Sequence, residues 1–123
     1  MKKQLRLTSN GFTIVELAVV ITVLAILVGI VVVGYGAWRD SISVSAIKSD
    51  LLAAKSAMEN ERNFSNGYPV ALPSSFDPSD EVTVTYSSGN ATSFCLQGRS
   101  TKNTALVYKI RQTDKEAQSG TCP

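Results

Sequence analysis

The sequence has no histidine, which removes the side chain that most often serves as a general base in enzymes and as a ligand to transition metals. It has only two cysteines, too few for a zinc site built from cysteine alone. It also has no Gly-x-Ser-x-Gly elbow, no glycine-rich phosphate loop and no cluster with metal-ligand spacing. We therefore expect no catalytic residue, no cofactor, no metal ion and no enzymatic activity.

Negative charge is scarce in the N-terminal part of the chain, where Glu16 is the only acidic residue before Asp40. Side chains of low polarity run from Leu17 to Trp38, and a helix of this length, about 33 Å, would cross a hydrocarbon core of roughly 30 Å. Three basic residues precede this stretch: Lys2, Lys3 and Arg6. Because positive charge is retained on the cytoplasmic side, the sequence predicts a cytoplasmic N-terminus, with residues 40–123 outside.

Three simpler interpretations of the apolar stretch also have to be considered. A buried core helix would need more covering chain than the residues after Asp40 provide. A secretory signal peptide has a shorter apolar region, of about 7–15 residues, and Gly34-Tyr35-Gly36-Ala37 is a poor cleavage site. A simple single-pass anchor fits the stretch itself but leaves the residues just before it unexplained.

Just before the apolar run, the small residue Gly11 precedes the large apolar residue Phe12, and the carboxylate of Glu16 lies at the start of the run. Two interpretations of Glu16 stay open. In the local one, Thr13 and Glu16 form a capping box, in which each side chain accepts a hydrogen bond from the other residue's backbone N–H. In the other, a cut between Gly11 and Phe12 creates an α-amino group that pairs with the Glu16 carboxylate, on the same chain or on a neighbouring one.

This arrangement resembles the class III signal of type IV pilins and pseudopilins: a basic leader, Gly11, then Phe12-Thr13-x-x-Glu16-Leu17 and an unbroken apolar helix. The resemblance implies that a prepilin peptidase cuts after Gly11 and that the new N-terminal Phe12 is methylated. It also implies that Glu16 forms an assembly salt bridge with the N-terminal amine of an adjacent subunit, while the apolar helices form the core of a helical filament. The motif itself spans only residues 11–17.

The sequence beyond residue 40 predicts an α+β head. Beyond Arg39, apolar residues recur every three or four positions, which is typical of an amphipathic helix. Together with the apolar run before it, this pattern predicts one helix from Thr13 to Arg62, membrane-spanning in its first half and amphipathic in its second. The amphipathic stripe comprises Val44, Ile47, Leu51, Ala54 and Met58. A loop rich in helix breakers is expected over 64–80. Alternating patterns then predict strands at 81–86, 92–97 and 105–111, separated by turns at 87–90 and 98–103. Together they give a small antiparallel sheet of about three strands packed on the helix, as in pilins.

Two cysteines, Cys95 and Cys122, bracket the last part of the chain. If residues 40–123 lie outside the cytoplasm, the simplest expectation is one disulfide between them. Pilins resemble this chain in having a C-terminal loop tied to the sheet by a disulfide. A pair of free thiols is the alternative.

Two groups of charged residues could each bind a partner, and each also has a simpler interpretation as solvated surface charge. The loop acids Asp77, Asp80 and Glu81 could hold a cation, and solvated acids explain them more simply. Five basic residues crowd the C-terminal part of the chain: Arg99, Lys102, Lys109, Arg111 and Lys115. They make a contact with nucleic acid conceivable, although a solvated sheet face is the simpler explanation.

The sequence therefore predicts three segments: a prepilin leader at 1–11, a transmembrane and assembly helix at 12–39, and an extracytoplasmic head at 40–123. The expected function is that of a structural subunit of a type IV pilus-like filament, serving adhesion or motility. The subunit would first sit in the lipid bilayer as a single-pass protein of the inner membrane, then in a pilus at the cell surface. Its expected partners are other copies of itself, the prepilin peptidase and the pilus assembly machinery. The alternative is a minor pilin or pseudopilin acting in secretion, adhesion or DNA uptake.

Overall fold

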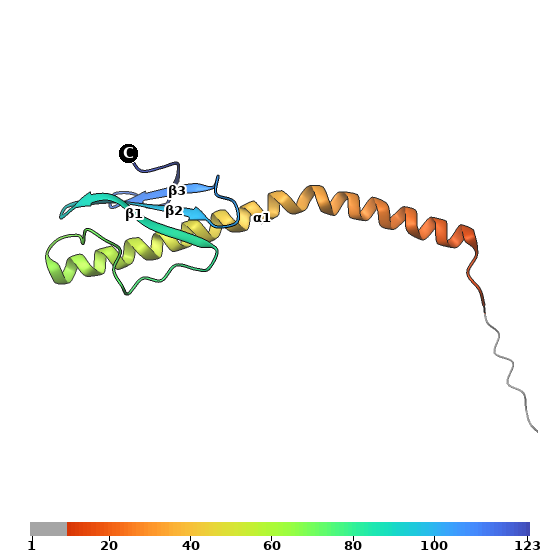
Figure 1. Cartoon of the computed structure of the whole chain (residues 1–123), viewed down its shortest axis with the longest axis horizontal. Helices are drawn as coiled ribbons and strands as arrows, with labels where there is room; N and C mark the ends of the chain where they lie inside the picture. Colours follow the sequence, from red (N-terminus) through yellow and green to blue (C-terminus); the bar gives the residue numbers. More distant parts are fainter. Residues whose placement is uncertain (1–9) are drawn as a thin grey trace, which may run out of the picture. The chain divides into compact units, whose positions relative to one another are not determined.

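A computed structural model describes residues 10–123, which form one helix, α1 (Ile14–Ser65), and four strands. The strands are β1 (Val82–Asn90), β2 (Ser93–Ser100), β3 (Val107–Arg111) and β4 (Gln118–Ser119). The sheet lies beside the second half of α1 (Figure 1). The predicted α+β fold is confirmed, with one strand more than predicted. The basic leader residues Lys2, Lys3 and Arg6 lie outside the described residues. The chain divides after Gly36 into two units, which are described one at a time.

The first unit is an apolar helical segment whose side chains find no cover within the unit. Its large apolar side chains are at least half exposed, from Val23 at 50% to Phe12 at 92%. The polar exception, Thr22, donates its hydroxyl to the backbone carbonyl of Ala18 over 2.8 Å, so the hydroxyl needs no other partner. This part of α1 is long and apolar enough to cross a membrane.

In the second unit, α1 buries one stripe of side chains against the sheet. The buried residues are Ser43, Ile47, Leu51, Ala54 and Met58. Four of these five belong to the predicted stripe. Val44 is only half-buried, and Ser43, one turn before Ile47, is buried in its place.

The helix extends three residues beyond the predicted end at Arg62. It stops at Asn66, whose φ of 57° is the left-handed conformation that commonly terminates helices and that asparagine tolerates. The Arg62 guanidinium lies 4.9 Å from the centre of the Tyr68 ring and donates a hydrogen bond of 3.2 Å to its hydroxyl. Tyr68 in turn meets Phe94 edge-on at 4.7 Å. These contacts stabilise the last turn, where the residue types alone favour a break.

The sheet is antiparallel in the order β1-β2-β3-β4. Its inner face contributes Val82, Val84, Phe94, Leu96 and Ile110 to the core around α1. The turn predicted at 87–90 is wrong: β1 continues to Asn90, with a register shift between Tyr86 and Ser88. The true turn follows, because the Asn90 side-chain oxygen accepts the backbone N–H groups of Thr92 and Ser93 over 2.9 and 3.0 Å. The turn predicted at 98–103 begins too early, since β2 runs to Ser100.

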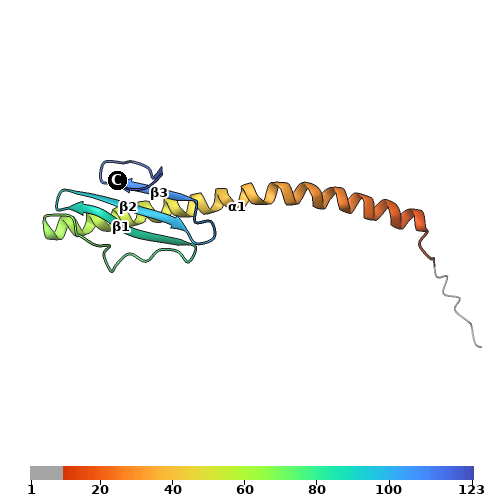
Figure 2. The ribbon, with the colours of Figure 1, turned by 45° about the horizontal axis from the view of Figure 1, so that its top comes forward.

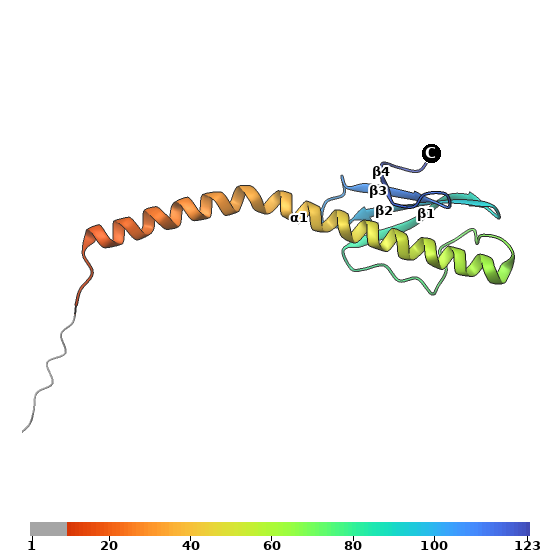
Figure 3. The same ribbon diagram turned by 180° about the vertical axis from the view of Figure 1, so that it is seen from behind.

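The fourth strand forms where no sequence period predicted one. β4 pairs with β3, with Lys109 opposite Gln118, and the following N–H of Gly120 donates to the carbonyl of Val107 over 2.9 Å. Figure 3 shows this short strand at the β3 side of the sheet. A two-residue strand has no alternation that sequence analysis can detect, so only the pairing with β3 identifies it.

Gly98 sets how closely α1 approaches the sheet. A Cβ at this position would lie 2.9 Å from Cγ2 of Ile47 and 3.0 Å from Cγ of Leu51. We expect Gly98→Ala to lower the free energy of unfolding of the head by about 1–3 kcal/mol, the usual cost of overpacking. Thermal unfolding of the full chain in detergent, followed by near-UV circular dichroism, measures this change. Arg99→Ala, at the exposed neighbour, is the control. Equal stability of Gly98→Ala and wild type would show that the helix can move away from the sheet freely.

Candidate functional site

The start of α1 is the first candidate site, because it combines an exposed peptide bond with a carboxylate at the head of the apolar helix. Gly11, Phe12 and Thr13 precede the helix and are all exposed. A Cβ added at Gly11 would meet no atom within 4 Å. The Gly11–Phe12 bond is therefore open to an enzyme, and a substitution at Gly11 would leave the packing of the described residues unchanged.

Glu16 is held in the first turn by a complete capping box. The backbone N–H of Thr13 donates to Oε2 of Glu16 over 3.0 Å, and the backbone N–H of Glu16 donates to Oγ1 of Thr13 over 3.2 Å. The Thr13 hydroxyl also donates to the same carboxylate oxygen, over 3.1 Å. In the uncleaved chain, Glu16 therefore forms the capping box with Thr13 that the sequence allowed. Both donors reach Oε2, which leaves Oε1 for a further donor.

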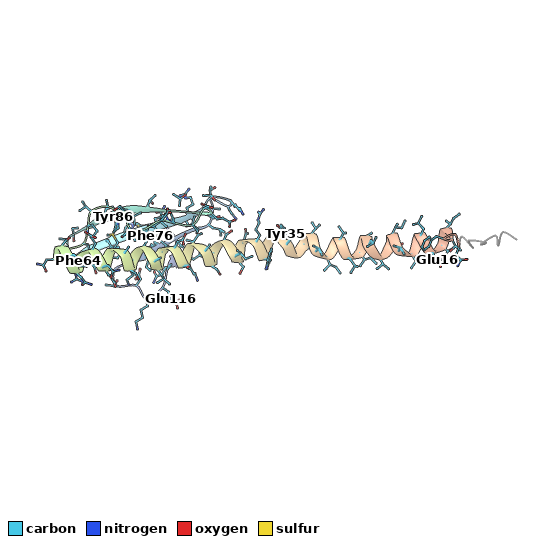
Figure 4. The ribbon with its side chains drawn as sticks, turned by 90° about the horizontal axis from the view of Figure 1, so that it is seen from below. Glu16, Tyr35, Phe64, Phe76, Tyr86 and Glu116 are labelled. Atoms are coloured by element: carbon cyan, nitrogen blue, oxygen red, sulfur yellow. A yellow bond between two sulfur atoms is a disulfide. The ribbon has the colours of Figure 1, made fainter. Side chains whose placement is uncertain are left out.

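The exposed apolar surface begins at this capping box and continues along α1. Figure 4 shows side chains projecting all round the helix from Glu16 onward, with Tyr35 further along. A helix that is apolar on every side is stable in lipid or among other apolar helices, and not in water. The segment therefore combines two properties that fit an assembly element: an uncovered apolar face and a carboxylate at one end.

The cysteine pair lies elsewhere, in the head. Cys95 in β2 and Cys122 in the C-terminal segment form a disulfide, with 6.0 Å between their Cα atoms. The N–H of Cys122 also donates to the side-chain oxygen of Gln97 over 3.4 Å. The disulfide therefore ties the C-terminal segment to β2 at a buried position, since Cys95 is 4% exposed.

The loop acids do not gather into a cation site. Among residues 10–123, no three His, Cys, Asp or Glu side chains come close enough together to hold a metal ion. Glu81 forms an ion pair with Lys102 instead. The basic residues are also partly paired, because Arg111 contacts Asp114 at 3.2 Å.

Sequence reasoning missed two contacts that organise the head. Asp50 accepts hydrogen bonds from the N–H and hydroxyl of Ser79, over 2.9 and 2.5 Å, and so ties the connecting loop to α1. Lys55 donates to the backbone carbonyl of Asp114 over 2.5 Å and ties the segment after β3 to the same helix. Both contacts join residues far apart in the chain, and no local pattern could have revealed them.

Comparison with known proteins identifies the N-terminal region. A family model described as the prokaryotic N-terminal methylation motif matches residues 6–32. The match includes the Gly11–Phe12 junction, the capping box and most of the apolar stretch. A search of the curated proteins found no match.

Proposed function

We propose that this chain, which carries the class III signal peptide of type IV pilins, is the structural subunit of a type IV pilus-like filament. The observation that carries the proposal is the uncovered apolar half of α1, which directly follows an exposed Gly11–Phe12 bond. Such a surface needs a partner that is itself apolar. The motif and the helix together support membrane anchoring first and a filament afterwards.

Processing would begin with hydrolysis of the Gly11–Phe12 peptide bond by a prepilin peptidase. Water adds across the bond, so that Gly11 leaves with a carboxylate and Phe12 keeps an amine. An α-amino group ordinarily has a pKa of roughly 7.7–8.0, so the amine is largely cationic at neutral pH. Methylation of this nitrogen keeps its charge and its ability to donate a hydrogen bond. The leader at 1–11 is then lost, and the assembly helix begins at residue 12.

Assembly would then pair the new amine with a carboxylate. In the uncleaved chain Glu16 already accepts from the backbone of Thr13, the residue next to Phe12. The free oxygen Oε1 can receive the amine of an adjacent subunit while the capping box persists. A charge among apolar helices is costly unless it is paired, so this contact would set the axial register between neighbours.

The proposed topology is that of a single-pass protein of the inner membrane with a cytoplasmic N-terminus. The head, residues 40–123, lies outside, which agrees with a disulfide in that part. After assembly the apolar segment leaves the bilayer for the filament core, and the head faces the cell exterior. The proposed role is structural, and the assembly machinery and further copies are the proposed partners. A minor pilin or secretion pseudopilin is the alternative within the same assembly mechanism.

Mass spectrometry of the native protein, combined with electron microscopy of sheared surface material, tests this proposal. We expect filaments that contain this chain, beginning at a methylated Phe12. Gly11→Val should block cleavage and abolish filaments while the head stays folded, because position 11 packs against nothing. Gly11→Ala, a smaller change, is the graded control. Recovery of assembled material that still begins at Met1 would overturn the proposal.

A further inference from the structure

Two places in the head carry the pattern Asn-x-Ser/Thr, which is the acceptor pattern for attachment of a glycan to an asparagine side chain. They are Asn63-Phe64-Ser65 and Asn90-Ala91-Thr92. So short a pattern also arises by chance, so the sequence does not separate an acceptor from a coincidence. The structure distinguishes the two, because the asparagines lie in different backbone conformations.

Asn63 lies in the last turns of α1, where the two residues of the pattern are kept apart. Residues that are two positions apart on a helix do not face each other, so the Ser65 hydroxyl points away from the Asn63 side chain. Within residues 10–123 the Asn63 side chain makes no hydrogen bond. An enzyme that binds the asparagine and the hydroxyl together would have to unwind this end of the helix.

Asn90 ends β1, and the turn that follows brings it together with Thr92. Oδ1 of Asn90 accepts the backbone N–H of Thr92 over 2.9 Å and the Thr92 hydroxyl over 2.8 Å. The N–H and hydroxyl of Ser93 donate to the same oxygen, over 3.0 and 3.1 Å. The amide nitrogen, Nδ2, donates no hydrogen bond to any residue that the structure describes. The oxygen is therefore fully engaged, while the nitrogen stays available.

This arrangement assists the nitrogen in attacking a sugar. An amide nitrogen is a weak nucleophile because its lone pair is shared with the carbonyl oxygen. When Nδ2 gives up a proton to a base of an enzyme, negative charge accumulates on Oδ1, and the donors of Thr92 and Ser93 are already in place to stabilise it. The turn thus prepares Asn90 for bond formation, and the helix does nothing comparable for Asn63.

The turn at Asn90 is also accessible and held in position. Asn90, Ala91 and Thr92 are all exposed. The Ala91 carbonyl accepts the N–H of Tyr68 over 3.0 Å, which ties the turn to the segment after α1. Figure 2 shows the turn between β1 and β2 at the same end of the head as the end of α1. An enzyme can therefore reach Asn90 without disturbing the core.

We propose that Asn90 is a glycosylation site and that Asn63 is not. In the reaction, Nδ2 of Asn90 forms a bond with the anomeric carbon of a glycan that is carried as a pyrophosphate on a membrane lipid. The bond between that carbon and the phosphate oxygen breaks, the pyrophosphate leaves with the electron pair, and the proton of Nδ2 passes to a base of the transferase. The proposal rests on the proposed location of the head outside the cytoplasm and does not require a filament.

A glycan on this turn would shield an apolar part of the head. The side chain of Phe64, at the end of α1, is 88% exposed, and that of Val70, in the segment that follows, is 72% exposed. Tyr68, which lies between them in the sequence, bonds to the turn. Exposed apolar surface favours non-specific association, and a bulky polar glycan nearby would reduce the area available for it.

Mass spectrometry of the full chain, isolated from the membranes of its own host, tests the proposal. Chymotrypsin cuts after aromatic residues and so releases peptide 87–94, which contains Asn90 without Asn63. We expect most copies of this peptide to be heavier by one glycan, and fragmentation that preserves side-chain linkages to place the glycan on Asn90.

Variants separate the contributions of the pattern. Thr92→Ser keeps a hydroxyl and should keep the glycan, whereas Thr92→Ala and Asn90→Gln should each lose it. Asn63→Gln is the matched control at the helical pattern and should leave the glycan unchanged. Immunoblots of the membranes show that all variants are present at equal levels.

Three results would overturn the proposal: peptide 87–94 at its unmodified mass, a glycan on one of its hydroxyl groups, or a glycan on Asn63 in place of Asn90. Labelling of intact spheroplasts with a membrane-impermeant amine reagent tests the location of the head separately. If the exposed Lys115 is labelled and Asn90 is unmodified, the glycosylation site is wrong while the proposed topology and function stand. If Lys115 is protected, the proposed location fails, and the glycosylation site fails with it.

Discussion

Glu16→Gln should leave the chain inserted in the membrane and the head folded, yet remove its filaments from the cell surface. Glutamine retains a side-chain oxygen that can accept the N–H of Thr13, so the capping box survives. It loses the negative charge that the N-terminal amine of an adjacent subunit would require. An amine left without a counter-charge among apolar helices opposes packing, so the expected effect on assembly is close to complete.

Thr13→Ala separates the two roles of this turn. It removes the hydroxyl that accepts from Glu16 and leaves the carboxylate in place. We expect Thr13→Ala to form filaments, with at most a modest decrease. Electron microscopy and immunoblots of sheared material, with membrane fractions as a loading reference, measure both variants. Normal filaments from Glu16→Gln would mean that Glu16 only caps the helix, and the assembly salt bridge would be wrong.

Removing the disulfide should have the largest effect on the stability of the head. In Cys95→Ser with Cys122→Ser, the tail loses its covalent link to β2 and keeps the short β4 pairing, the hydrogen bond from Gly120 to Val107 and the contact of residue 122 with Gln97. A cross-link that spans a sequence separation of 27 residues stabilises by roughly 3–4 kcal/mol in the chain-entropy model. The double variant should therefore be destabilised by about that amount.

Tryptic digestion of the full chain in detergent measures this loss, because five basic residues follow Cys95. We expect the double variant to be cut far faster than the wild type, and wild type treated with reductant to behave like the variant. Treatment with reductant should not change the digestion of the double variant, which controls for other effects of the reagent. Equal digestion rates in all samples would show that β4 and the core hold the tail without the disulfide.

The long helix and the three longer strands were predictable because their signals are local. The apolar run, the stripe from Ile47 to Met58 and the alternation around Val84 each repeat within a few residues. The junction at Gly11 was also readable, since the motif is contiguous. Its cleavage, and the pairing of Glu16 with a neighbour, remain predictions.

The ends of the elements were less predictable because distant contacts decide them. The residues 63–65 favour a break, but the stacking of Arg62 on Tyr68 carries the helix on to Ser65. The serines after Tyr86 favour a turn, but pairing with β2 continues the strand to Asn90. In each case a contact that was invisible in the local sequence stabilised the less expected conformation.

The sequence by itself determined that this chain has one apolar helix in need of apolar partners, because hydropathy and helical periodicity are properties of neighbouring residues. It also determined the motif at the junction ahead of that helix and the alternation of the main strands. Only the tertiary structure decided where β4 pairs and which segments are tied to the second half of α1. Those features depend on residues that are far apart in the sequence and meet only in the fold: Asp50 with Ser79, and Lys55 with Asp114.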